Sequence, residues 1–128
     1  MKVLMDTHAF LWWVTDDSRI SVKASEIIAD VENELFLSSA SAWEIVIKSR
    51  LGRLQLPNNP DIYVAEQMTL NAIQSLSITM HHALQLYNLP DIHKDPFDRL
   101  LIAQSLSEDM PILTKDGHIA KYGIQTIW

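Results

Sequence analysis

The chain contains no cysteine. It therefore has no disulfide framework, no thiolate nucleophile and no zinc site built on cysteine ligands. No apolar run approaches the roughly 20 residues that a membrane-spanning helix needs, and no basic leader precedes an apolar signal segment at the N-terminus. From these absences we expect a cytoplasmic protein that does not enter a membrane.

Positive charge is also scarce, with 10 Lys and Arg against 16 Asp and Glu and a formal net charge of −6. Proteins that coat nucleic acids normally present a basic face, so this balance argues against that class. It does not exclude a nuclease that gathers carboxylates around metal cations. The length of 128 residues, 48% of them hydrophobic and 20% charged, predicts a globular chain folded as one domain over residues 1–128.

Short apolar runs alternate with helical patterns along the chain. A buried strand that leads directly into a helix is the start of a βα unit, so this alternation predicts an α/β fold with a mostly parallel sheet. The expected strands cover residues 2–5, 35–38, 72–78, 112–114 and 124–127, and the expected helices cover residues 7–14, 21–33, 39–51, 61–70, 79–87 and a segment that begins at 96.

The stretch 93–104 is the clearest helix start. Asp95 is a good N-cap and Pro96 suits the first helical position. Asp98 then lies in the first turn, where free backbone N–H groups favour an anion. Two interpretations are open: Asp98 completes a capping box with Asp95, which also pairs with Arg99, or Asp98 is one ligand of a metal site.

Three further acids occupy similar positions, and each also has a structural explanation. Asp6 follows the first strand and could simply cap the next helix. Glu44 could close a capping box with Ser41 and pair with Lys48 four residues later. Asp116 precedes a glycine in a common turn signature.

The topology favours a shared site over four separate caps. In a parallel sheet the carboxyl ends of the strands meet at one edge, so Asp6, Glu44, Asp98 and Asp116 are predicted to converge there. Clustered carboxylates raise one another's pKa and need a cation to stay ionised. Oxygen ligands without cysteine select hard cations such as Mg²⁺ or Mn²⁺. Such an ion activates water and polarises a phosphoryl oxygen, which is the chemistry of a phosphodiesterase.

Four segments together resemble the PIN-domain ribonucleases, specifically the VapC-like toxins of type II (VapBC) toxin–antitoxin systems. The segments are VLMDTHAFLWW (residues 3–13), SASAWEI (39–45), DPFDRLLIAQ (95–104) and LTKD (113–116).

The resemblance implies a three-layer α/β/α sandwich with a central, mostly parallel sheet of about four to five strands. It implies that Asp6, Glu44, Asp98 and Asp116 form an acidic metal site, that Thr7 and Thr114 orient those acids, and that Asp95 is a helix cap. It further implies Mg²⁺- or Mn²⁺-dependent cleavage of single-stranded or loop RNA, a homodimer, and inhibition by a VapB-like antitoxin. One departure is that Gly117-His118-Ile119 stand where relatives often carry an aromatic residue.

Other residue assignments are looser. Lys48, Arg99 and Lys115 are candidate contacts to substrate phosphates. The tryptophans at positions 12, 13 and 43 are assigned to the core in preference to a binding groove, and the adjacent histidines 81 and 82 to packing or the surface.

Two rival folds fit poorly. A receiver domain needs a phospho-accepting Asp after its middle strand, and residues 35–39 have none. A haloacid-dehalogenase-type phosphatase needs Asp-x-Asp after the first strand, whereas His8 stands at the third position here. Two alternatives within the same family stay open, namely a non-catalytic binding module and a housekeeping RNA-processing nuclease.

Overall fold

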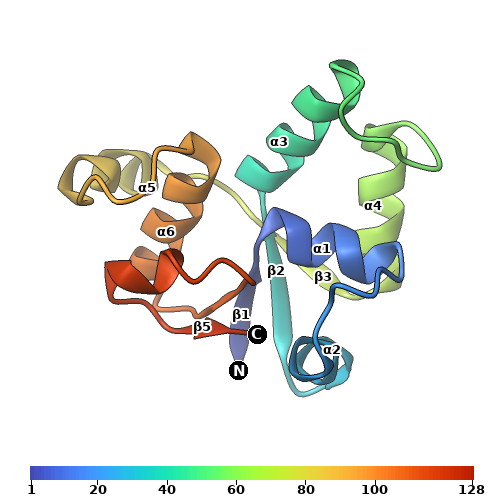
Figure 1. Cartoon of the computed structure of the whole chain (residues 1–128), viewed down its shortest axis with the longest axis horizontal. Coiled ribbons are helices and arrows are strands. Elements are labelled where there is room, and N and C mark those ends of the chain that lie inside the picture. The colour runs from blue at the N-terminus through green and yellow to red at the C-terminus, as the bar shows by residue number, and fades with distance from the viewer.

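The computed structural model describes all 128 residues. Figure 1 shows the arrangement of the elements along the chain. They are β1 (Lys2–Met5), α1 (Thr7–Val14), α2 (Val22–Ala29), β2 (Glu34–Ser38), α3 (Ser39–Arg50), α4 (Pro60–Leu70), β3 (Ile73–Leu76), α5 (Met80–Gln85), the 3₁₀ turn η1 (Leu86–Asn88), α6 (Pro96–Glu108), β4 (Ile112–Leu113), the 3₁₀ turn η2 (Ile119–Tyr122) and β5 (Thr126–Ile127).

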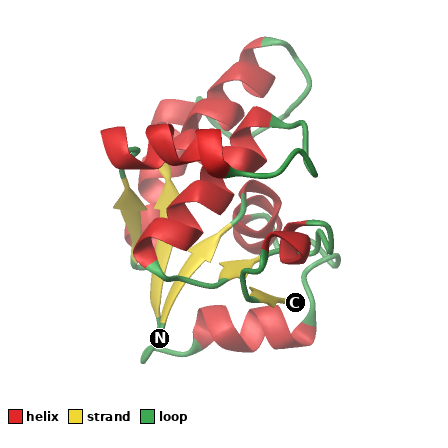
Figure 2. Ribbon diagram, turned by 90° about the vertical axis from the view of Figure 1, so that its left-hand side faces the viewer, coloured by secondary structure: helices red, strands yellow, loops and turns green.

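The five strands form one sheet in the order β3-β2-β1-β4-β5, and every neighbouring pair is parallel. The predicted α/β/α sandwich is confirmed, with α1 to α4 on one side of the strands and α5 and α6 on the other (Figure 1). Figure 2 shows the strands twisting relative to one another between these helices. The chain builds β2 and β3 on one side of β1 and then β4 and β5 on the other, so β1 lies at the topological switch point.

The side chains of β1 point alternately to the two faces of the sheet and contribute to two separate hydrophobic cores. Val3 and Met5 point into a core with Phe10 of α1, whereas Leu4 points to the opposite face and packs with Leu101 of α6. All five side chains are fully buried. Because successive strand residues face opposite sides, four residues are enough to attach both helical layers to the central strand.

Several element boundaries differ from the prediction. Helix α2 ends at Ala29, not near residue 33, so Val31, within the predicted helix, is 93% exposed. In α4 the apolar residues Ile62 and Ala65 are exposed, whereas Tyr63 and Val64 are buried. Helix α4 has a weak amphipathic pattern, which leaves its buried face ambiguous by a residue.

The start of α3 is a second correction. Ser38 is the N-cap, and its hydroxyl accepts from the Ala40 amide at 3.0 Å, so the capping box predicted between Ser41 and Glu44 does not form. The helix therefore begins where β2 ends, and the Glu44 side chain is free for other contacts.

His82 lies inside the fold and links α5 to α6. Its Nδ1 accepts from the Thr79 amide at 3.0 Å, and its Nε2 lies 2.8 Å from Glu108 Oε1. The side chain is fully buried, in agreement with the expected packing role. No helix in the structure combines the length and apolar character needed to cross a membrane.

Truncation within α6 tests this division into two cores. Leu101→Ala removes a fully buried side chain and should lower the free energy of unfolding by about 2–5 kcal/mol. Leu106→Ala, on the same helix at 47% exposure, should change it by roughly 1 kcal/mol or less. Urea unfolding followed by circular dichroism measures both, and equal losses would contradict the assignment of Leu101 to the second core.

Candidate metal centre

Asp6 stands at the carboxyl end of the central strand β1, as the N-cap of α1. Its Oδ1 accepts from the Ala9 amide at 2.7 Å, and it also receives a hydrogen bond from the Thr114 side chain. The same Thr114 hydroxyl accepts from the Asp116 amide at 3.0 Å. Asp6 is only 7% exposed. Thr114 thus connects the acid that follows β1 with the acid that follows β4.

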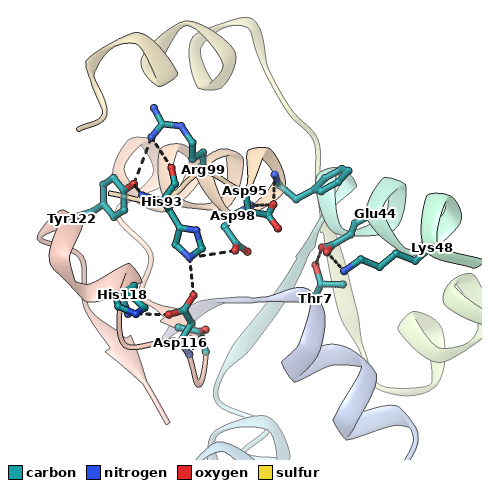
Figure 3. Close-up of polar contacts among 12 residues, drawn as sticks. Thr7, Glu44, Lys48, His93, Asp95, Asp98, Arg99, Asp116, His118 and Tyr122 are labelled. Atoms are coloured by element: carbon teal, nitrogen blue, oxygen red, sulfur yellow. Dashed lines mark hydrogen bonds and ion pairs between the residues drawn. The ribbon is translucent and has the colours of Figure 1, made fainter. Parts of the chain in front are cut away.

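Asp95 caps α6 as expected, because its Oδ1 accepts from the amides of Phe97 at 2.8 Å and Asp98 at 3.2 Å. The rest of the purely structural interpretation is wrong. Asp98 makes no return hydrogen bond to Asp95, and Arg99 does not pair with Asp95. The Asp98 carboxylate turns away from the cap toward His93 (Figure 3).

His93 contacts both Asp98, in the first turn of α6, and Asp116, which follows β4. Its Nε2 lies 2.7 Å from Asp116 Oδ2 and 3.5 Å from Asp98 Oδ2. The hydrogen bond with Asp116 raises the pKa of His93. Partial burial acts to raise the pKa of Asp116, but the hydrogen bonds from His93 and from the His118 amide outweigh it and lower the pKa overall.

The sequence reasoning missed His93. Its only local signal is its place two residues before the N-cap Asp95 of a helix whose first turn carries Asp98.

Glu44 lies on the other side of the site and is 4% exposed. The Thr7 hydroxyl donates to Glu44 Oε1 at 2.7 Å and lies 2.9 Å from the Ser41 hydroxyl. Lys48 Nζ contacts Glu44 Oε2 at 2.6 Å, which confirms the predicted i,i+4 pair. In Figure 3 Glu44 points toward Thr7 and Lys48, whereas Asp98 and Asp116 point toward His93.

A cavity of about 350 Å³ opens between these groups at the carboxyl edge of the sheet. Three of the four predicted acids line it together, and Glu44 does not. The lining residues are Asp6, His8, Trp12, Arg19, Asp98, Lys115 and Asp116.

The acids perturb one another's ionisation. Burial, opposed by hydrogen bonds and reinforced by the charge of Glu44, raises the pKa of Asp6. Burial and then the charge of Asp95 raise the pKa of Asp98 to about 7, with further contributions from Glu44 and Asp6. Placing two such carboxylates against one cavity is unfavourable without a cation, and a cation bound there would restore their ionised forms. The donor set therefore fits a hard divalent ion.

A second hollow of about 380 Å³ adjoins this cavity and shares His8, Trp12 and Arg19 with it. Its wall includes Lys48 and Arg53. Arg19, Lys48 and Arg53 thus line the approach to the acids, together with Asp17, which pairs with Arg19 at 2.8 Å.

The aromatic and basic residues differ in part from their predicted places. Trp12 lines both hollows, with the Arg19 guanidinium 4.8 Å and Lys115 Nζ 5.9 Å from its ring. Trp43 is 57% exposed against Phe97, so neither of these tryptophans belongs to the core. Trp13 packs against the first core as predicted.

The Arg99 guanidinium points inward and binds backbone carbonyl oxygens. Its Nη1 donates to the carbonyl oxygens of Pro90 at 3.0 Å and His93 at 3.3 Å, and its Nη2 to that of Leu86 at 3.4 Å. These contacts support a role for Arg99 in anchoring the backbone of the loop. They do not support the predicted contact between Arg99 and a substrate phosphate.

The fold and the cavity describe an α/β protein with acids gathered at the switch point of a parallel sheet. A family model of the PIN domain matches residues 3–125, and the chain belongs to this family. The resemblance carried by the four sequence segments is thereby confirmed. The chain is 28% identical over 121 residues to Ribonuclease VapC22 of Mycobacterium tuberculosis, covering 94% of this chain and 91% of the relative. It is 43% identical over 56 residues to Ribonuclease VapC16 of the same organism, covering 44% and 40%.

Solved structures share the fold at low sequence identity. VapBC2 from Rickettsia felis, bound to a DNA fragment from its promoter, matches with a TM-score of 0.72 at 9% identity over 99% of this chain and 98% of that one. VapBC-1 from nontypeable Haemophilus influenzae matches with a TM-score of 0.67 at 14% identity over 99% and 97%.

The shifted pKa values at this site predict how the stability of the protein depends on pH when EDTA removes metal ions. Because the pKa of Asp98 lies above its unfolded-state value, the folded protein binds more protons than the unfolded chain between about pH 4 and pH 7. The contribution of Asp98 to the free energy of unfolding therefore falls as the pH rises through that window. The raised pKa of His93 contributes stability below its unfolded value of 6.5 that is also lost on raising the pH.

We expect the Tm of the metal-free protein to fall between about pH 5 and pH 8, and Asp98→Asn to flatten this dependence. At about pH 8 the variant should be more stable than the wild type by on the order of 1 kcal/mol. Asp109→Asn, at the exposed far end of α6, should leave the profile unchanged. Identical profiles for wild type and Asp98→Asn would contradict the unfavourable ionisation of Asp98 that we infer from its burial and from the nearby acids.

Proposed function

We propose that this protein is a metal-dependent endoribonuclease, the toxin of a type II toxin–antitoxin pair acting in the cytoplasm. The observation that carries the proposal is the meeting of Asp6, Asp98 and Asp116 at one cavity of a PIN fold. The names of the relatives, both ribonucleases of the VapC type, support the same activity.

In this proposal Asp98 and Asp116 would hold Mg²⁺ or Mn²⁺. Asp6 lines the same cavity outside the group of ligand atoms that lie within 4.8 Å of one another, so it would have to move toward the ion to join them. When bound, such an ion would supply an activated water and would neutralise charge on the scissile phosphate. Thr114 fixes Asp6 and Asp116 relative to each other through its hydroxyl. Thr7 orients Glu44. Glu44 can become the predicted fourth ligand only if its carboxylate exchanges Lys48 for the ion, and otherwise it adds negative charge next to the site.

The basic hollow beside the cavity is the proposed path of the RNA strand. Arg19, Lys48 and Arg53 face it, and Lys115 lines the metal cavity itself. These side chains supply phosphate contacts, which position the strand without reading its sequence. We expect single-stranded or loop RNA as the substrate, because its unpaired backbone can bend into the cavity.

A VapB-like antitoxin and a second copy of the chain are the proposed protein partners. Several matched structures are named as toxin–antitoxin complexes, VapBC2 and VapBC-1 among them. An antitoxin that covers the acidic cavity would exclude both metal and RNA. Expression of the chain alone should then arrest growth, and co-expression of the small protein encoded beside it should relieve the arrest.

The activity itself gives the direct test. Purified protein should cleave structured RNA with Mg²⁺ or Mn²⁺ present, and EDTA should stop cleavage. Asp98→Asn should lower the rate by roughly 100-fold or more, because it removes a charged ligand from the cavity. Gel analysis of end-labelled RNA measures the rate.

Asp109→Asn is the matched control for that experiment, since it makes the same change at the opposite end of α6 in a residue with left-handed backbone that asparagine tolerates. It should cleave like the wild type. Cleavage by Asp98→Asn at the wild-type rate would locate the activity elsewhere or in a contaminant, and a folded wild type without metal-dependent cleavage would favour the non-catalytic alternative.

Substrate binding can be tested separately with catalysis blocked. In the Asp98→Asn background, Lys115→Gln should weaken RNA binding and reduce the slope of log K against log salt by about 0.7, the value for one phosphate contact on a single strand. Lys23→Gln, an exposed position on α2 outside both hollows, should change neither quantity. Fluorescence anisotropy over a salt series measures them, and equal effects of the two substitutions would argue against this path for the RNA.

A further inference from the structure

His93 occupies a place that the acidic site does not explain. His93, Asp98 and Asp116 form the only group of three or more His, Asp or Glu side chains whose potential ligand atoms all lie within 4.8 Å of one another. One of those three atoms is a nitrogen. The metal site proposed above rests on oxygen donors alone, so this imidazole is an additional donor at the same place.

The backbone around His93 is held in position from two sides. The His93 amide donates to the Tyr122 hydroxyl at 2.6 Å, and the His93 carbonyl accepts from Arg99 at 3.3 Å. Arg99 also binds the carbonyls of Pro90 and Leu86, which fixes the segment that leads to His93. The His93 side chain is 20% exposed. The backbone that carries the ring is thus fixed next to the carboxylates.

The spacing of the donors suits a shared ion. Ligands at about 2.1 Å from an octahedral ion lie roughly 3 Å apart when they are adjacent. The distances of 2.7 Å and 3.5 Å from His93 Nε2 to Asp116 and Asp98 bracket that value. An ion between the three atoms would therefore require small movements of the side chains and the loss to solvent of the Nε2 proton that His93 shares with Asp116.

We propose that His93 Nε2 is a ligand of the ion held by Asp98 and Asp116, and that this nitrogen gives the site a preference for Mn²⁺ over Mg²⁺. The inference rests on the proposed metal-dependent function and specifies its ion. Mg²⁺ is bound almost entirely through oxygen, whereas first-row transition ions accept imidazole readily. A mixed nitrogen and oxygen donor set therefore shifts selectivity away from Mg²⁺.

Pulsed electron paramagnetic resonance of the Mn²⁺-loaded wild type tests the ligation without reference to activity. The spin echo should be modulated by ¹⁴N, and His93→Gln should abolish that modulation. His8→Gln and His118→Gln should retain it, although His8 lines the same cavity and the His118 ring lies 6.5 Å from that of His93. His93→Asp gives a second variant, which should bind Mn²⁺ with no ¹⁴N modulation.

Calorimetric titration of the wild type and His93→Gln with each ion measures the selectivity. The Mn²⁺ affinity should fall by about 10-fold or more in His93→Gln. The Mg²⁺ affinity should change by less than about 3-fold, since Mg²⁺ gains little from the nitrogen.

The outcomes separate this inference from the function on which it rests. Bound Mn²⁺ without ¹⁴N modulation in the wild type, or modulation that persists in His93→Gln, would overturn the role of His93 and leave the carboxylate site intact. Equal losses of Mn²⁺ and Mg²⁺ affinity would overturn the selectivity. Unchanged Mn²⁺ binding in Asp98→Asn would instead remove the proposed metal site itself.

Discussion

The burial of carboxylates at the end of the central strand, together with the repulsion between them, is the constraint on which the rest of the site depends. Asp6 is fixed there by the sheet, and Asp98 is brought toward it by the start of α6, with the pKa values of both raised. Two sets of contacts in the surrounding structure offset this cost. Lys48 neutralises Glu44, and His93 bridges Asp98 and Asp116. What remains unbalanced is the negative cavity, whose charge and size suit a divalent cation.

Much of this arrangement follows from local sequence signals combined with one rule of topology. A buried strand that ends at Asp6, the cap-proline start of α6 and the strand before Thr114 can each be recognised from a few residues. The rule that parallel strands share a carboxyl edge then brings three distant acids together, and the structure does place Asp6, Asp98 and Asp116 around one cavity. The roles of these acids as ligands stay predictions.

The parts that could not be predicted depend on contacts between distant segments. His93 lies in a loop, and its position is set by Arg99 and by Tyr122, which stands 29 residues later in the chain. Glu44 matched a capping pattern, but Ser38 caps the helix instead and leaves Glu44 to Thr7 and Lys48. A local pattern cannot tell which of two nearby serines will win such a competition.

The neighbouring positions of Asp98 and Arg99 have a consequence for how related chains can vary. One turn of α6 presents the Asp98 carboxylate and, through Arg99, binds the backbone of the loop that carries the His93 imidazole. An inserted residue between η1 and the N-cap Asp95 would move His93 away from the Arg99 guanidinium that binds its carbonyl oxygen. The length of this connection, and not only its composition, therefore matters wherever both donors serve the same ion.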